Sequence, residues 1–127
     1  MDRSKILIVE DDDFLRDVYV DTLTNEGYQV DIATNGNEGF EKIRQGGYDL
    51  VLLDIILPQI DGLEIMRRVK ADPDIKQNKL VVFLTNLDND NELKEALKLG
   101  NGYLIKSQLT PGDLVHEVKL YLSKTPS

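Results

Sequence analysis

The chain contains no cysteine and no run of apolar residues long enough to span a membrane. Without cysteine, a disulfide scaffold, a thiolate zinc site and a cysteine nucleophile are all excluded. No apolar run approaches the ~20 residues that a spanning helix needs, and residues 1–5 lead directly into a strand rather than into a signal-peptide core. These absences predict a cytoplasmic protein with no membrane partner.

The sequence also has fewer basic than acidic residues. Lysine and arginine together number 15 against 23 aspartate and glutamate residues, which gives a formal net charge of −8. This balance opposes direct binding to nucleic acid and favours a basic partner or a bound cation. The length of 127 residues fits one domain. We expect that domain to occupy residues 1–123, followed by a C-terminal tail at 124–127.

Hydrophobic patterning predicts five strands alternating with five helices. Apolar runs at 5–9, 49–54, 79–84 and 102–105 are typical of strands buried in a parallel sheet, whereas 28–33 alternates with period 2, as an edge strand does. Helical spacing covers 14–26, 37–44, 63–71, 88–99 and a last segment opened by Thr110 and Pro111. Asp13 is the expected cap of the first helix. The pattern predicts an α/β fold, a flavodoxin-like doubly wound parallel sheet of order 2-1-3-4-5.

Chemistry-bearing side chains follow the strands at the points where these end. Glu10 and Asp11 follow the first strand, Asp54 closes the third, Thr85 the fourth and Lys106 the fifth. Carboxyl ends of parallel strands share one edge of a sheet, where such folds bind ligands. Three neighbouring carboxylates repel one another unless a cation or a lysine compensates them. An all-oxygen ligand set predicts Mg²⁺, or Mn²⁺, rather than zinc or copper.

A metal, a carboxylate, a hydroxyl and a lysine together favour phosphoryl transfer. Asp54 would attack phosphorus, the metal and Lys106 would neutralise the phosphoryl oxygens, and Thr85 would donate a hydrogen bond to one of them. The predicted product is an aspartyl phosphate.

These residues, in this order, resemble the receiver domain of two-component response regulators over essentially the whole chain. The matching stretches are residues 5–13, residues 52–58 with Asp61 and Gly62, residues 84–85, and residues 102–106. The resemblance implies that Asp54 is the phosphoacceptor and that Glu10 and Asp11 hold Mg²⁺. It further implies direct ligation by Asp11 and Asp54, ligation by Glu10 through water, and a last protein ligand from the main-chain carbonyl of Ile56.

The resemblance also implies a function and partners. Thr85 and Tyr103 match the family's switch pair, and a sensor histidine kinase or a histidine phosphotransfer protein would donate the phosphoryl group. Output would use the face formed by helix 88–99, strand 102–105 and the last helix, where a downstream protein or a second receiver docks. Such a domain catalyses its own phosphorylation and dephosphorylation without being a conventional enzyme. The bulky Ile56 and Leu87 predict a long-lived phosphate, because they hinder an attacking water.

Three positions depart from the family pattern. Ser107 follows Lys106 where the family usually has a proline, Asn86 replaces a small residue after Thr85, and the link 100–103 is one residue shorter than is common. These departures support an alternative function, a phosphorylation-independent receiver that acts as a protein-binding module.

Two further functions are less consistent with the sequence. A phosphohydrolase of the haloacid-dehalogenase type needs an acid two residues after its nucleophile, where this chain has Ile56. A nucleotide or flavin module needs a glycine-rich phosphate loop, and none follows the first strand. His116, the only histidine, is interpreted as a surface side chain rather than a phosphorelay histidine.

Overall fold

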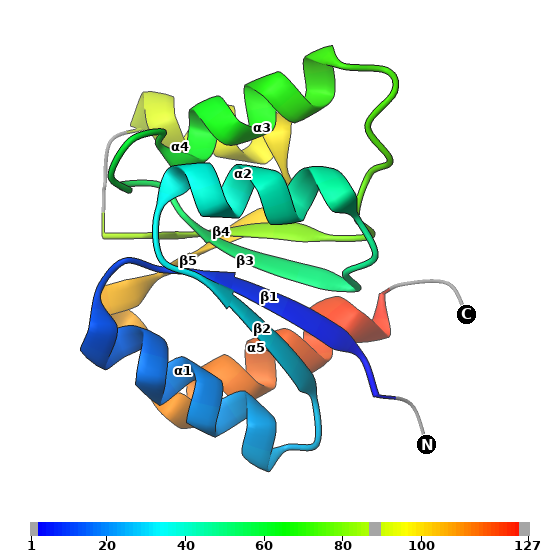
Figure 1. Cartoon of the computed structure of the whole chain (residues 1–127). Coiled ribbons are helices and arrows are strands. Elements are labelled where there is room, and N and C mark those ends of the chain that lie inside the picture. Colours follow the sequence, from blue (N-terminus) through cyan, green and yellow to red (C-terminus); the bar gives the residue numbers. More distant parts are fainter. Residues whose placement is uncertain (1–2, 87–89, 125–127) are drawn as a thin grey trace.

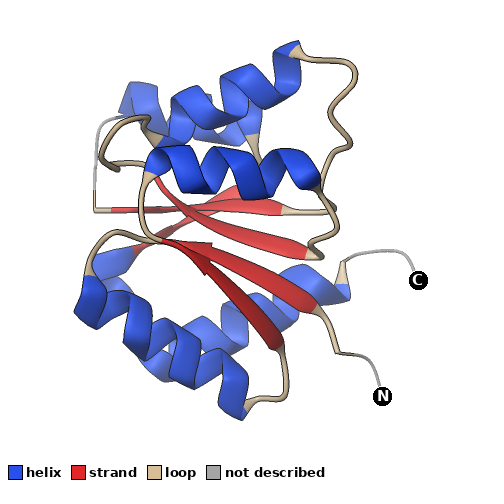
Figure 2. Cartoon of the chain, viewed as in Figure 1, coloured by secondary structure: helices blue, strands red, loops and turns tan. Residues whose placement is uncertain are grey.

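Five short parallel strands form the sheet at the centre of the molecule (Figures 1 and 2). The computed structural model describes residues 3–86 and 90–124. The strands are β1 (Lys5–Val9), β2 (Gln29–Ala33), β3 (Leu50–Asp54), β4 (Val81–Thr85) and β5 (Gly102–Ile105). Their spatial order is β2-β1-β3-β4-β5, which confirms the predicted flavodoxin-like topology.

Helices cover both faces of this sheet. They are α1 (Asp13–Asn25), α2 (Gly36–Gln45), α3 (Gly62–Ala71), α4 (Asp90–Leu99) and α5 (Pro111–Ser123). Figure 1 shows α2, α3 and α4 on one face and α1 and α5 on the other. The predicted start of the fourth helix at Asp88 and the tail residues 125–127 lie outside the described residues. Within the described ranges, no helix is long and apolar enough to cross a membrane.

The core has two halves because successive strand side chains point to opposite faces. In β1, Leu7 and Val9 pack toward α2, α3 and α4, whereas Ile6 and Ile8 pack toward α1 and α5. Every residue of β3 and β4 is buried. Strand β2 is only partly buried, as expected of an edge strand. Because all five strands are parallel, their carboxyl ends lie at the same edge of this buried sheet.

The cap of α1 differs from the prediction. Asp13 is the first residue of the helix, and its cap is Asp12, which has an extended backbone (φ −75°, ψ 115°) and accepts a hydrogen bond from the Leu15 amide at 2.9 Å. Both residues have a side chain that can cap a helix. Asp12 is the cap because its amide donates a hydrogen bond to Oε2 of Glu10, at 3.1 Å, and this bond holds Asp12 just before the helix begins.

The chain beyond β5 turns into a short 3₁₀ helix, η1 (Lys106–Gln108), that the sequence did not predict. The Lys106–Ser107 peptide is trans. On the other side of β5, the short link from α4 is docked on β4. There the Asn101 amide donates to the Val81 carbonyl at 2.7 Å, and the Asn101 side chain accepts from the Val81 amide at 2.8 Å.

Candidate functional site

An acidic pocket lies at the carboxyl edge of the sheet. Its volume is about 330 Å³, and its lining residues are Glu10, Asp11, Asp12, Asp54, Ile56, Thr85, Asn86 and Lys106. They come from the ends of β1, β3, β4 and β5 and from the loops that follow them. Four segments far apart in the sequence meet there because all of these strands run in the same direction.

Lys106 lies between two buried carboxylates. Its Nζ is 2.9 Å from Oε1 of Glu10 and 2.9 Å from Oδ2 of Asp54. Burial disfavours the ammonium charge, but the hydrogen bonds to Glu10 and Asp54 outweigh it, so the pKa of Lys106 is raised. The lysine therefore stays protonated and supplies a fixed positive charge in the pocket.

Asp54 is only 4 % exposed at the end of β3. Burial raises its pKa to about 7, with the Glu10 carboxyl adding to the rise and Lys106 opposing it. In the absence of a further cation, this carboxyl therefore binds its proton far more tightly than an aspartate in water. A second positive charge would restore the carboxylate form.

Three carboxylates are placed to hold that charge. Glu10, Asp11 and Asp54 each offer an oxygen, and these oxygens all lie within 4.8 Å of one another. Octahedral Mg²⁺, with ligands at about 2.1 Å, spaces its oxygens about 3–4 Å apart, so a small closure of the cluster suffices. The donor set is all oxygen, and it fits Mg²⁺ or Mn²⁺.

Local structure holds these ligands in place. The Arg16 side chain, from the first turns of α1, donates to the Glu10 carbonyl at 2.9 Å, while the Asp12 amide holds the Glu10 carboxylate. Behind Asp54, the chain returns at Gly62, whose amide donates to the Ile55 carbonyl at 2.7 Å. A Cβ at position 62 would collide with the Asp54 carbonyl oxygen. Glycine is required there by this close approach of two backbones.

The structure brings together six of the seven predicted site residues, namely Glu10, Asp11, Asp54, Ile56, Thr85 and Lys106. The Thr85 side chain is buried, whereas 63 % of Ile56 is exposed at the pocket. Tyr103 is not among the residues that line this pocket. It is partly buried and packs against the half of the core covered by α2, α3 and α4.

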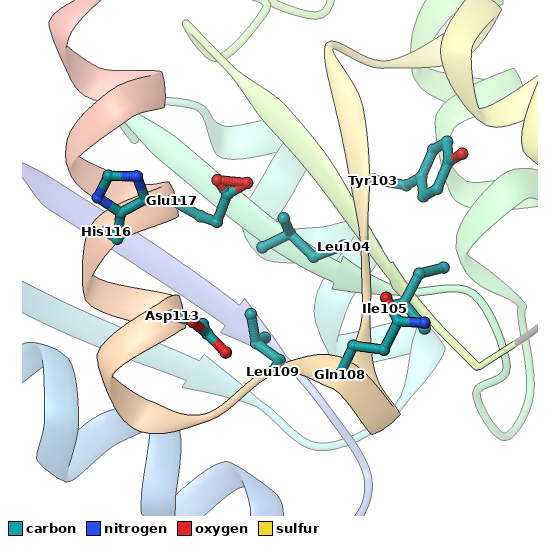
Figure 3. Close-up of a pocket in the computed structure, with 8 residues that line it drawn as sticks. All are labelled: Tyr103, Leu104, Ile105, Gln108, Leu109, Asp113, His116 and Glu117. Atoms are coloured by element: carbon teal, nitrogen blue, oxygen red, sulfur yellow. The ribbon is translucent and has the colours of Figure 1, made fainter.

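A second cavity, of about 360 Å³, lies between β5, η1 and α5. Figure 3 shows its lining residues, with the Tyr103 ring on the side of β5 away from His116 and Glu117. His116 is exposed on α5, in line with its interpretation as a surface side chain. The other lining residues with an ionisable side chain are Tyr103, Asp113 and Glu117.

Two contacts in and beside the pocket were not predicted. The first is the Asp12 amide bond to Glu10, which places Asp12 at the pocket as well as at the helix start. The second joins two of the three departures from the family pattern, because the Ser107 amide donates to Oδ1 of Asn86 at 2.9 Å. The only sequence signal for this second contact was that each residue directly follows a site residue.

Comparisons with known proteins identify the family of this chain. The family model of the response regulator receiver domain matches residues 6–119. The chain is 41% identical over 107 residues to an uncharacterised transcriptional regulatory protein, YkoG of Bacillus subtilis, covering 84% of this chain and 46% of that protein. It is 32% identical over 124 residues to the transcriptional regulatory protein CrdR of Helicobacter pylori, covering 98% and 57%. The chain thus spans about half the length of these relatives.

Solved structures show the same architecture. A two-component response regulator from Clostridium difficile superposes with a TM-score of 0.86 at 30% identity, covering 98% of this chain and 100% of that one. A CheY-like receiver domain protein from Methanospirillum hungatei gives a TM-score of 0.82 at 31% identity, covering 97% and 96%.

Proposed function

Because this chain belongs to the response regulator receiver domain family of two-component systems, we propose that it is a signalling switch operated by phosphorylation of Asp54. The observation that carries this proposal is the placement of Lys106, 2.9 Å from Asp54 and backed by the buried Glu10. A cation fixed beside a buried carboxylate could serve only to stabilise the fold, or it could assist phosphoryl transfer. We favour phosphoryl transfer, because the ammonium lies where the negative charge of a phosphoryl group on Asp54 would develop.

In the proposed reaction, an oxygen of the Asp54 carboxylate attacks the phosphorus of a phosphohistidine. The new P–O bond forms as the P–N bond breaks, and the electron pair of that bond stays on the histidine nitrogen of the donor. Lys106 balances the negative charge of the phosphoryl oxygens, and the Thr85 hydroxyl donates a hydrogen bond to one of them. The product is an acyl phosphate on Asp54.

The reaction also calls for a divalent cation. Asp11 and Asp54 would hold Mg²⁺ directly, Glu10 through water, and the Ile56 carbonyl would complete the protein ligands. When bound, Mg²⁺ supplies positive charge that offsets the repulsion between the carboxylates and the incoming phosphoryl group. The chain's own part is to hold Lys106 beside Asp54, where it opposes the rise in the Asp54 pKa that burial causes.

Phosphorylation would change the shape of one face of the molecule. The Thr85 hydroxyl moves toward the phosphoryl group, and the Tyr103 ring, partly buried in this structure, turns further inward. The affected face comprises α4, β5 and α5, where a downstream protein or a second copy would dock. The phosphodonor would be a sensor histidine kinase or a histidine phosphotransfer protein in the cytoplasm.

Incubation with phosphoramidate followed by intact-mass spectrometry tests this function. We expect an adduct of about 80 Da that requires Mg²⁺ and is absent from the Asp54→Asn variant. If a well-folded wild-type protein gains no adduct, that result contradicts the proposed function and favours the alternative, a receiver that binds partners without phosphorylation.

A further inference from the structure

A contact beside Lys106 indicates a further residue with a part in the proposed phosphoryl transfer. Lys106 and Ser107 are the first two residues of η1, whose amides have no partner within the helix itself. Ile105, which precedes η1, makes no side-chain capping bond. Oδ1 of Asn86 accepts from the Ser107 amide at 2.9 Å instead. Asn86 therefore caps η1 from a different segment of the chain.

The position of this bond relates it to Lys106. The ladder between β4 and β5 ends at the pair Thr85 and Ile105. Asn86 is one residue past the ladder on β4 and Ser107 is two residues past it on β5, so their bond joins the two segments again just beyond Lys106. Lys106 is consequently held on its N-terminal side by the ladder and on its C-terminal side by the Asn86 side chain.

The charge balance of the pocket makes this restraint matter. Lys106 Nζ must reach Glu10 and Asp54 at the same time, at 2.9 Å from each. A backbone N–H only donates, so the end of the Asn86 amide that faces Ser107 is the oxygen. Loss of that acceptor would leave the start of η1 free to move relative to β4, and the ammonium would move with it.

We propose that Asn86 is a positioning residue for Lys106, which it holds in place by capping η1 from the end of β4. This inference rests on the proposed function and adds a residue to it. It also assigns a single role to two departures from the family pattern, because the Asn86 side chain is the acceptor and the Ser107 amide is the donor. Asn86 acts through Lys106 and does not itself touch the phosphoryl group.

A double-mutant cycle tests the proposal. The variants are Asn86→Ala, Lys106→Met and both together, with Asn37→Ala as a control at an exposed asparagine in α2. The measured quantity is the rate of phosphorylation by phosphoramidate at saturating Mg²⁺. We expect Asn86→Ala to slow the reaction about threefold to tenfold in the wild-type chain and to have no further effect when Lys106 is already methionine. Asn37→Ala should leave the rate unchanged.

Three further measurements exclude a general structural effect. Asn86→Ala should bind Mg²⁺ at least as tightly as wild type in the unphosphorylated protein, because Asn86 is not a proposed ligand and a displaced Lys106 competes less for the carboxylates. It should also speed hydrogen exchange of the Ser107 amide, which loses its acceptor. The urea midpoint of each variant confirms that it is folded.

The outcomes separate this inference from the proposed function. If wild type is not phosphorylated at all, the proposed function fails and the inference falls with it. If wild type is phosphorylated and Asn86→Ala reacts equally fast, the positioning role is wrong. If Asn86→Ala slows the reaction equally in the Lys106→Met chain, Asn86 acts on the phosphoryl group directly, and that result also overturns the proposal.

Discussion

The Nζ of Lys106 and the Oδ2 of Asp54 lie 2.9 Å apart, although 52 residues separate them in the sequence. Lys106 reaches Glu10 at the same distance. One ammonium thus compensates two carboxylates that are nearly inaccessible to water, with Glu10 at 0 % and Asp54 at 4 % exposed. Removal of the Lys106 charge therefore leaves two buried carboxyl groups without a positive partner.

Replacement of Lys106 by methionine keeps the side-chain volume and removes the charge. We expect this variant to lose about 2–4 kcal/mol of unfolding free energy without metal, because Glu10 and Asp54 then lie unpaired. Phosphorylation should slow about 100-fold, and Mg²⁺ should bind more tightly because its competitor is gone. Urea unfolding, phosphoramidate kinetics and Mg²⁺ titration measure the three effects.

Lys79→Met is the matched control. Lys79 pairs with Asp49 at 3.1 Å, but its side chain is 59% exposed. Exposed ion pairs contribute about 0–1 kcal/mol, so this variant should unfold close to wild type and accept phosphate at the normal rate. Equal losses in the two lysine variants would contradict a special role for Lys106.

The raised pKa of Asp54 predicts how stability depends on pH. Burial raises this pKa to about 7 in the folded protein, so the folded state holds a proton that the unfolded chain has already released. The stabilising protonated form is therefore lost as pH rises toward and through 7. Without metal, we expect the unfolding free energy to fall by about 1–3 kcal/mol between about pH 5.5 and about pH 8.

Urea unfolding in the presence of a chelator measures this dependence, and Asp54→Asn is its control. The asparagine does not titrate, so most of the fall should disappear. The carboxyls whose pKa is lowered, such as those of Asp49 and Glu64, titrate below this range and do not mask the effect. An unchanged pH dependence in Asp54→Asn would mean that another group is responsible.

Metal binding should stabilise the folded chain. At a Mg²⁺ concentration 100 times the dissociation constant, linkage gives a gain of about 2.7 kcal/mol. Asp11→Ala should abolish this gain without destabilising the metal-free protein, because Asp11 is exposed and repels its acidic neighbours. Asp13→Ala, at an exposed acid outside the cluster, should retain the gain. Thermal unfolding with Mg²⁺ or with chelator distinguishes the two variants, and stabilisation that survives in Asp11→Ala would place the ion elsewhere.

The backbone at Gly62 lies so close to Asp54, the proposed phosphoacceptor, that there is no room for a side chain at position 62. An alanine there would force its Cβ against the Asp54 carbonyl, so we expect Gly62→Ala to cost about 1–3 kcal/mol and to slow phosphorylation. Gly112→Ala is the opposite control, because the nearest atom to its new Cβ is 3.9 Å away. Gly112 is the second residue of α5, and alanine is a better helix former than glycine, so this variant should be at least as stable as wild type. A tolerated alanine at position 62 would show that the two backbones can separate freely.

The exposed Ile56 side chain predicts the lifetime of the phosphate. It lies at the pocket with 63 % of its surface exposed, where we expect it to hinder the approach of water to a phosphoryl group on Asp54. Leu87, the other residue expected to do this, lies outside the described residues. We expect Ile56→Ser to speed the decay of the phosphorylated protein severalfold, as followed by mass spectrometry after removal of the donor. A wild-type lifetime of only seconds would contradict this role.

Much of the fold is predictable from this sequence because local patterns agree with the sheet. The apolar run Leu50–Asp54 predicts a buried strand, and the alternating pattern of Gln29–Ala33 predicts an edge strand. The structure contains both. The strand order and the parallel direction then bring Glu10, Asp54 and Lys106 to one edge. Residue type and strand ends therefore suffice to locate the pocket.

The remaining features depend on contacts between segments. Asp12 and Asp13 have equal capping chemistry, and the hydrogen bond to Glu10 decides between them. The start of η1 is capped by Asn86, a residue 21 positions away from Ser107. A capping bond between distant segments has no signature in local sequence, since either residue alone is ordinary in a loop.

The identity of the phosphorylated residue is the most direct test of the central claim. Borohydride reduction converts an aspartyl phosphate to homoserine, and peptide mass spectrometry then locates the converted residue. After treatment with phosphoramidate and Mg²⁺, we predict homoserine at position 54 and unmodified aspartate at the neighbouring Asp11 and Asp12. Homoserine at any other position, or an adduct that resists reduction, would contradict the assignment of Asp54 as the phosphoacceptor.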